Sequence, residues 1–511
     1  MHAPARRGSP AVLLVAILAI VALIAAGCGG DSDDGTTGAD GEGDTIEPAE
    51  PTEPETDEAD GEAGDGEAEG EAAEEEATAE PEGPVFTDPE LDARLQEATD
   101  AIIETMFECT TEPAEGLTAT ERGVTADTIS IAFLENDWTT LVALNTAVDL
   151  GPEGDHFRAF MDQINECGGI HGRQIEVNVY RFDPINFPQQ DATCIEATAE
   201  DENLLVVARI LTRESPLCIV EQNETPLITS SQFPREFYDR ADGRLFGVDP
   251  TGDELLDLIA RDLVATEVLG PDSVLGILSP DTPAETFAVR DGLIPTLEEL
   301  GIEYVDVVIP STGLACDGYN TAVSRFQEAG VTHVMPTLGP TCYPPFVLEA
   351  TALGWFPQYI ATPFGGMTSN TSTQRLVDAG DAFDGAVGVH TLPGEAFYGG
   401  PAAPFEQACN DITNETLGYD YVYGDTIFGA ITVWCTIALA LQQGLEAAGP
   451  DLTRESFLAG METVTDIPLR RGGLGSFGPD KRTLVENVVW GQTWRSECGC
   501  WREPNGPREV N

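Results

Sequence analysis

The sequence predicts an α/β protein with two doubly wound lobes, each built on a parallel sheet between helices. The apolar run 129–134 suits a buried strand, and the alternating Ile175, Val177 and Val179 have the period of another. Between them, residues 157–164 place apolar side chains at three- and four-residue spacing, which indicates a helix with one buried face. A strand, a helix and a strand in this order form the crossover that opens a parallel sheet. The pattern restarts near Asp253, which predicts the second lobe.

Gly168 and Gly169 mark the end of this first helix. Glycine is the residue that most readily takes a positive φ just past a helix end, so we expect a left-handed cap, a short turn and then the strand.

The remaining elements follow the same apolar periods. Helices are expected at 88–108, 190–200, 253–264, 284–300, 320–329 and 425–445, with a short helix after Ser215. Strands are expected at 204–210, 226–229, 273–278, 303–309, 333–336 and 357–361, and a last strand at 485–494.

The N-terminal residues are typical of an exported protein. Arg6 and Arg7 precede a small and apolar run at 11–26, which has the layout of a secretory signal and is short for a membrane span. The sequence Ala25-Ala26-Gly27-Cys28 resembles a bacterial lipobox, so residues 1–28 are expected to be a lipoprotein signal peptide with Cys28 carrying the lipid. An ordinary signal peptide with an incidental cysteine is the alternative.

Residues 29–84 contain 23 acidic residues and no lysine or arginine. Such a segment cannot bury apolar area and repels itself, so we expect a disordered, extended tether rather than an acidic interaction tail. The whole chain carries a formal net charge of −66, and an excess of acids remains after residue 84. A surface this negative argues against binding to nucleic acid or to anionic lipid headgroups.

The chain has 11 cysteines, and ten remain if Cys28 is lipidated. An even number in an exported chain favours disulfides over free thiols. Local spacing suggests the pairs Cys194–Cys218, Cys316–Cys342 and Cys409–Cys435, and leaves Cys109, Cys167, Cys498 and Cys500 without an assigned partner. Cys498-Gly-Cys500 lacks a second pair at zinc spacing, so no metal site is predicted.

The opening segments carry a family resemblance. Gly123-Val-Thr-Ala-Asp-Thr-Ile-Ser-Ile131, followed by Ile164-Asn165-x-x-Gly168-Gly169-Ile170-x-Gly172-Arg173-x-Ile175, resembles the start of type I periplasmic binding proteins. The branched-chain amino acid and amide type of ABC-transporter substrate-binding proteins is the most similar group, and the likeness runs from about Gly123 to Trp494.

This resemblance implies a domain organisation. Residues 85–123 would be an N-terminal helical extension, 124–249 with 391–482 one lobe, and 250–390 with 483–511 the other. Three hinge crossings would lie near residues 249, 390 and 482.

The resemblance also implies a ligand between the lobes, held by loops that follow the strands. The implied ligand-binding residues are Trp138, Leu211, Thr212, Ser230, Ser231, Gln232, Phe233, Asp281, Thr282, Thr341, Tyr343, Thr362, Phe364 and Tyr421. Amino-acid-binding members place an acidic residue after the strand matched by 357–361, where this chain has Thr362, Pro363 and Phe364. A buried ammonium without a counter-charge is costly, so an ordinary α-amino acid is disfavoured unless another acid such as Asp281 serves.

Motifs of common enzymes are missing from the sequence, which has no Walker loop, no His-Glu-x-x-His and no Gly-x-Ser-x-Gly. The five histidines form no metal spacing, and Gly473-x-Gly475-x-x-Gly478 lacks the strand and helix of a dinucleotide site. We therefore expect no enzyme and no cofactor.

The leading hypothesis is a monomeric, lipid-anchored, extracytoplasmic binding protein that delivers an amino-acid-like compound, amide or organic acid to the permease of an ABC importer. A ligand-sensing receptor subunit using the same cleft and an exported enzyme with an unseen carboxylate pair remain alternatives.

Overall fold

The computed structural model describes residues 88–510, except 109, 144–146, 148, 313–314, 392–401, 424 and 470–472. These residues belong to one compact unit, Pro81–Asn511. The predicted signal peptide, acidic tether and Cys28 lie outside the described residues.

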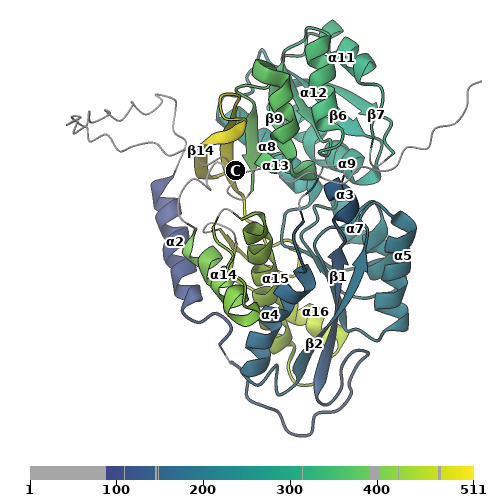
Figure 1. Ribbon diagram of the computed structural model, residues 1–511, viewed down its shortest axis with the longest axis vertical. Helices are drawn as coiled ribbons and strands as arrows, with labels where there is room; N and C mark the ends of the chain where they lie inside the picture. The colour runs from purple at the N-terminus through teal and green to yellow at the C-terminus, as the bar shows by residue number, and fades with distance from the viewer. Residues whose placement is uncertain are drawn as a thin grey trace, which may run out of the picture. The chain divides into compact units, whose positions relative to one another are not determined.

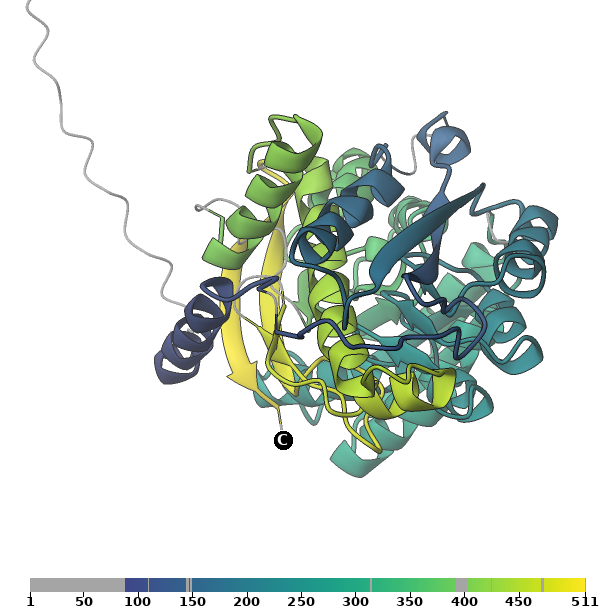
Figure 2. The same cartoon turned by 90° about the horizontal axis from the view of Figure 1, so that it is seen from below.

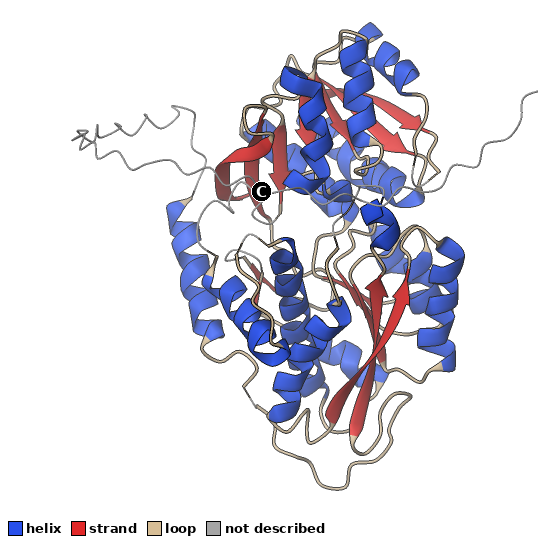
Figure 3. Cartoon of the chain, viewed as in Figure 1, coloured by secondary structure: helices blue, strands red, loops and turns tan. Residues whose placement is uncertain are grey.

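The first sheet has five parallel strands in the order β2-β1-β3-β4-β5. Its two long strands β1 and β2 are seen side by side in Figures 1 and 3. The strands are β1 (Thr128–Asn136), β2 (Gln174–Phe182), β3 (Leu205–Ala208), β4 (Leu227–Thr229) and β5 (Leu245–Gly247). Side chains of β1 alternate between two cores, with Ile129, Ile131 and Phe133 on one face and Ala132 and Leu134 on the other. Both faces are therefore buried, as expected for a parallel sheet. This sheet and its helices are called lobe 1.

Helices of lobe 1 cover both of those faces. One core contains residues of α4 (Glu153–Glu166), α15 (Thr426–Ala448) and α16 (Arg454–Met461). The other contains residues of α5 (Phe187–Ile195), the π-helical turns η1 (Glu196–Glu200) and η2 (Cys218–Gln222), α6 (Ser215–Leu217) and α7 (Arg235–Arg240). The short α3 (Thr139–Ala143) follows β1, and α14 (Pro404–Leu417) packs against α4 and α15.

Helix α15 is long and apolar enough to span a membrane by length and composition, but it is largely buried. Trp434 and Cys435 at its centre are inaccessible to solvent. It therefore serves as a core helix of lobe 1 in this structure.

The turn after α4 shows why its glycines are required. Gly169 has a φ of 73°, and a Cβ there would lie 2.0 Å from the carbonyl oxygen of Arg173. Arg173 is itself buried and donates hydrogen bonds to the carbonyl oxygens of Thr125, Thr118 and Pro450. The turn thus ties the segment before β1 to the end of α15.

The second sheet repeats the strand order of the first and extends it. Its order is β14-β13-β10-β9-β8-β6-β7. Strands β6 to β10 are parallel, β13 runs antiparallel to β10, and β14 runs antiparallel to β13. The strands are β6 (Val274–Pro280), β7 (Glu303–Ile309), β8 (His333–Pro336), β9 (Gln358–Ala361), β10 (Val387–His390), β13 (Val488–Arg495) and β14 (Cys500–Glu509). This sheet and its helices are called lobe 2.

Helices of lobe 2 also form two layers. One core contains residues of α8 (Gly252–Ala265), α9 (Pro283–Ala288), η3 (Val289–Leu293) and α10 (Ile294–Leu300). The opposite core contains residues of α11 (Tyr319–Glu328), α12 (Tyr343–Ala352) and the 3-10 segment η5 (Gln374–Ala382). The turns η4 (Phe364–Gly366) and α13 (Asn370–Thr373) follow β9.

Strand β14 corrects the expectation that 485–494 would be the last strand. It pairs antiparallel with β13, with register shifts at two points, and Arg508 forms an ion pair with the buried Asp262 of α8. Pro504 and Pro507 are unusual in a strand because proline cannot donate to the ladder, and an edge position tolerates them. The sequence did not predict this strand, because it contains two prolines among mostly polar residues and shows no apolar period.

The chain passes between the lobes close to Gly247, which forms a parallel bridge with Thr483. Gly247 N–H donates to the carbonyl of Arg482, and Leu484 N–H donates back to that of Gly247. A two-stranded ladder of β11 (Ile467–Pro468) and β12 (Leu474–Gly475) precedes this passage.

The extension helix α2 (Pro89–Ile103) was expected to lie against the first lobe, but it contacts both lobes. It packs on α14 of lobe 1, while Asp88 N–H donates to the carbonyl of Pro507 and Arg94 pairs with Glu509 of β14 at 3.1 Å. Figures 1 and 2 show α2 beside both elements. Helix α2 therefore links the two lobes.

Disulfides join Cys194 to Cys218, Cys316 to Cys342 and Cys409 to Cys435, the three pairs suggested by spacing. A fourth joins Cys498 to Cys500 in the turn between β13 and β14, and Cys167 is also disulfide-bonded. Cys109 lies outside the described residues.

Candidate functional site

The carboxyl edge of the lobe 1 sheet gathers the polar loops that the sequence singled out. In the order β2-β1-β3-β4-β5, the chain runs from β1 to β2 on one side and then crosses β1 to add β3 on its other side. Doubly wound sheets of this order bind ligands beyond the carboxyl ends of the two strands at this switch point. Asn136 and Trp138 stand at the end of β1, and Arg209 directly follows β3.

Hydrogen bonds from both neighbouring loops fix the backbone that follows β3. The hydroxyls of Ser230 and Ser231 donate to the carbonyl of Arg209 at 3.1 and 3.0 Å. Leu211 N–H donates to the Ser231 hydroxyl at 3.1 Å, and the Asn136 amide donates to the carbonyl of Ile210 at 3.1 Å. The two serines were expected to bind ligand, and in this structure they hold residues 209–211 in place.

A buried carboxylate lies behind this loop. Glu153, at the start of α4, is 1% exposed and accepts a hydrogen bond of 2.8 Å from the indole of Trp138. Burial raises the pKa of Glu153, while the nearby guanidinium of Arg209 opposes that rise. Trp138 is thus a buried partner of Glu153, packed in the lobe 1 core.

Tyr421, in the segment between α14 and α15, contacts His156, which lies about one helical turn after Glu153 on α4. Its hydroxyl is 3.3 Å from Nε2 of His156, and the ring of Tyr419 packs against it at 4.8 Å. His156 is fully buried, and this desolvation lowers its pKa to about 4. The imidazole is therefore neutral at neutral pH.

Three of the predicted residues meet where the chain enters lobe 2. Gly252 N–H donates to the carbonyl of Phe233, and a Cβ on Gly252 would lie 3.3 Å from the carbonyl oxygen of Gln232 and 3.2 Å from the ring of Phe364. Phe233 and Phe364 are both buried. Thr212 lies apart from them, with its N–H and hydroxyl directed at the side-chain oxygen of Gln190.

The predicted residues of lobe 2 are dispersed. Asp281 is exposed and accepts from Ser311 N–H at 2.7 Å, and the half-buried Thr341 lies against the Cys342 sulfur. Tyr343 lies in the lobe 2 core, where its hydroxyl donates to the carbonyl of Ile360. The hydroxyl of the buried Thr362 has no hydrogen-bond partner among the described residues.

An acid that sequence reasoning missed follows Asp281 by four residues in the chain. Glu285, in the first turn of α9, accepts a short hydrogen bond from the Thr282 hydroxyl, and desolvation raises its pKa. A carboxylate three residues after a threonine that precedes a helix is a usual arrangement for a helix start, so the sequence alone gave no reason to single it out.

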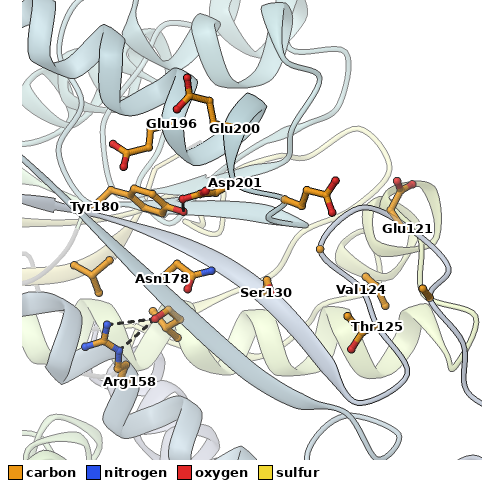
Figure 4. Close-up of a pocket in the computed structure, with 15 residues that line it drawn as sticks. Glu121, Val124, Thr125, Ser130, Arg158, Asn178, Tyr180, Glu196, Glu200 and Asp201 are labelled. Atoms are coloured by element: carbon orange, nitrogen blue, oxygen red, sulfur yellow. Dashed lines mark hydrogen bonds between the residues drawn. The ribbon is translucent and has the colours of Figure 1, made fainter.

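A pocket of about 910 Å³ lies elsewhere on lobe 1, at the amino-terminal half of β1 (Figure 4). Acidic groups, including Glu121, Glu196 and Asp201, dominate its lining. Tyr180 donates to Asp201 at 2.7 Å, and burial raises the pKa of Tyr180 to about 12. None of the predicted site residues lines this pocket, and the described residues contain no cluster of His, Cys, Asp or Glu able to hold a metal.

Comparison with known proteins identifies the family. A family model described as "Periplasmic binding protein" matches residues 146–496, which is well over half of the chain. The chain belongs to the periplasmic binding protein family. No curated protein matches the binding protein in sequence.

Solved structures share the fold of the binding protein at low sequence identity. A fatty acid ABC transporter substrate-binding protein from Thermomonospora curvata matches with 15% identity and a TM-score of 0.53, covering 78% of this chain and 96% of its own. A branched-chain amino acid ABC transporter protein from Thermus thermophilus with bound valine matches with 15% identity and a TM-score of 0.56, covering 75% and 97%. A solute binding protein from Rhodopseudomonas palustris BisB5 in complex with 3,4-dihydroxybenzoic acid matches with 14% identity and a TM-score of 0.52, covering 75% and 98%.

These matches confirm the predicted fold, two lobes with parallel-rich sheets in the type I arrangement. Family membership also makes the binding protein a transport component rather than an enzyme.

Proposed function

We propose that this chain is the extracytoplasmic solute-binding component of an ABC importer and holds a small polar solute between its two lobes. The family match over residues 146–496 is the observation that carries the proposal. The repeated strand order supports it, because each lobe then has a parallel sheet whose carboxyl edge carries polar loops, the usual place for a ligand. The chain crosses between the two lobes more than once. Closure of such lobes around a ligand is a hinge motion.

The proposed solute is an organic acid, an amide or an amino-acid-like compound. It has no ammonium group that would need a carboxylate of the protein as its partner. Thr362, Pro363 and Phe364 follow β9, so no acid stands at that point. The structural relatives bind or are named for a fatty acid, valine and 3,4-dihydroxybenzoic acid, all of which carry a carboxyl group.

A thermal-shift screen of the chain from residue 29 tests this function. Amino acids, amides, aromatic acids, fatty acids and polyamines would each be added well above micromolar concentration. A solute at a hundred times its dissociation constant adds about 2.7 kcal/mol to stability, which is readily measured. If no compound stabilises the protein, and native mass spectrometry finds no bound solute, the proposal is wrong. Turnover of any compound would instead revive an enzymatic function.

Membrane anchoring through Cys28 is a separate proposal, because that residue lies outside the described part of the chain. The wild type expressed in a bacterium should partition into detergent, and Cys28→Ala should not. A wild type that is cleaved and remains in the aqueous phase would show that the signal peptide is an ordinary one.

A further inference from the structure

Arg209 lies at the switch point of lobe 1 with most of its hydrogen-bonding capacity unused. Its side chain is 24% exposed, and the polar contact that the structure gives the guanidinium is the ion pair of Nη1 with Oε2 of Glu153 at 3.7 Å. This separation is too long for a hydrogen bond, whereas a guanidinium has five N–H donors. Among the described residues, no hydrogen bond from this side chain is formed.

The backbone of Arg209 is held while its side chain is not. Its carbonyl accepts from Ser230 and Ser231, and the next two residues are bonded to Asn136 and Ser231. The guanidinium therefore projects from a fixed point between the ends of β1 and β3. Binding of a partner therefore has to order the side chain of Arg209 but not the backbone that carries it.

Glu153 does not use up the charge of Arg209. The carboxylate is 1% exposed, and its Oε2 has no hydrogen-bond partner among the described residues. Arg209 is the more accessible member of the pair, because its side chain is 24% exposed and that of Glu153 is 1% exposed.

We propose that Arg209 is the group that binds the acidic moiety of the solute, and that the solute is therefore a carboxylate or a comparable oxyanion. This inference rests on the proposed function and specifies the solute class at that site. A guanidinium suits a carboxylate because two parallel N–H groups match its two oxygens.

Matched pairs of acid and amide test the inference. Benzoate with benzamide, octanoate with octanamide, and leucine with leucinamide would be titrated calorimetrically into wild type. In the pair whose apolar body fits, the acid should bind about 10- to 100-fold more tightly than the amide, since charge-assisted hydrogen bonds are the stronger ones. Equal binding of both members, or preference for the amide, would overturn the inference.

Variants locate the effect. Arg209→Gln should lose that preference, and Arg209→Lys should retain part of it because it keeps the charge without the planar fork. Arg240→Gln is the matched control, since it removes the same charge from an outer helix where Arg240 pairs with Glu221 and Glu214. Glu153→Gln should bind the acid at least as tightly as wild type, because it removes a nearby negative charge while keeping an acceptor for Trp138.

The outcomes separate the two proposals. If a neutral or cationic compound from the screen binds wild type and Arg209→Gln equally, the inference is wrong and the solute-binding function stands. If Glu153→Gln abolishes binding and Arg209→Gln does not, the site recognises a cation and the inference is again wrong. If nothing binds wild type, the proposed function itself fails.

Discussion

The ring of Phe107 stacks on that of Phe160 with 5.7 Å between their centroids, so the segment after α2 is anchored in the core of lobe 1. Phe107 is 6% exposed and belongs to the same core as residues of α4 and α15. The N-terminal extension is thus part of the folded body.

Phe107→Ala should lower the free energy of unfolding by about 3–5 kcal/mol, because it removes a buried aromatic ring and leaves a cavity. Urea unfolding followed by fluorescence measures this. Phe356→Ala is the control, since Phe356 is 63% exposed and its loss should change stability by less than about 0.5 kcal/mol. Equal, small effects would mean that the extension is only loosely attached.

Gly252→Ala should lower the free energy of unfolding by about 1–3 kcal/mol, because it overpacks the segment where the chain enters lobe 2. The added Cβ would lie 3.0 Å from Cβ of Ala288 and 3.3 Å from the carbonyl oxygen of Gln232, and a backbone oxygen cannot move aside cheaply. Gly270→Ala is the matched control because no heavy atom lies within 4 Å of the added Cβ. Thermal unfolding of both variants checks this, and a neutral Gly252→Ala would show that the passage yields.

His156 should make the protein lose stability as the pH falls from about 6.5 toward 4. Its folded-state pKa is about 4, below the ordinary value of 6.5, so in this window the unfolded chain binds a proton that the folded chain does not. The stability of wild type relative to His156→Gln should therefore fall by about 1–2 kcal/mol between pH 7 and pH 5. Glu153 titrates in both proteins and cancels in this comparison. A pH-independent difference would mean that the imidazole is protonated in the fold.

Reduction should open the Cys498–Cys500 disulfide before the others. Cys498 is exposed in the turn between β13 and β14, whereas Cys409 and Cys435 are fully buried. Thiolate attack on a disulfide depends on access. Mild dithiothreitol followed by alkylation and peptide mass spectrometry should label Cys498 and Cys500 first. Labelling of Cys409 at the same rate would mean that lobe 1 opens under these conditions.

Much of the fold follows from local patterns in the sequence. The predicted strands 303–309 and 333–336 coincide with β7 and β8. Short continuous or alternating apolar runs between helices indicate buried strands of a parallel sheet. Helix α7 was missed because the six residues Arg235–Arg240 are too short to show a period. Strand β14 was missed because polar residues and prolines dominate it.

The site was less accessible to sequence reasoning. Ser230 and Ser231 could be singled out because hydroxyls after a strand are typical of binding loops, but their common acceptor, the carbonyl of Arg209, lies 21 and 22 residues earlier. Arg209 itself looks like any charged residue after a strand. Its relation to Glu153 depends on the position of α4 relative to the sheet, which no local pattern records. Tyr343 had the right spacing for a loop residue, and its ring is instead inside lobe 2.

The hydrogen bond from Asp88 N–H to the carbonyl of Pro507, 3.1 Å long, places the start of the folded body beside its end. A short peptide could therefore join residue 510 to residue 88 and make the body a closed ring. New termini could then be opened at the turn around Gly330, which has no atom within 4 Å of an added Cβ. The two termini of such a circular permutant would lie on lobe 2, at the turn around Gly330. Fluorescent reporters could be fused to them without changing the contacts of α2 with the two lobes.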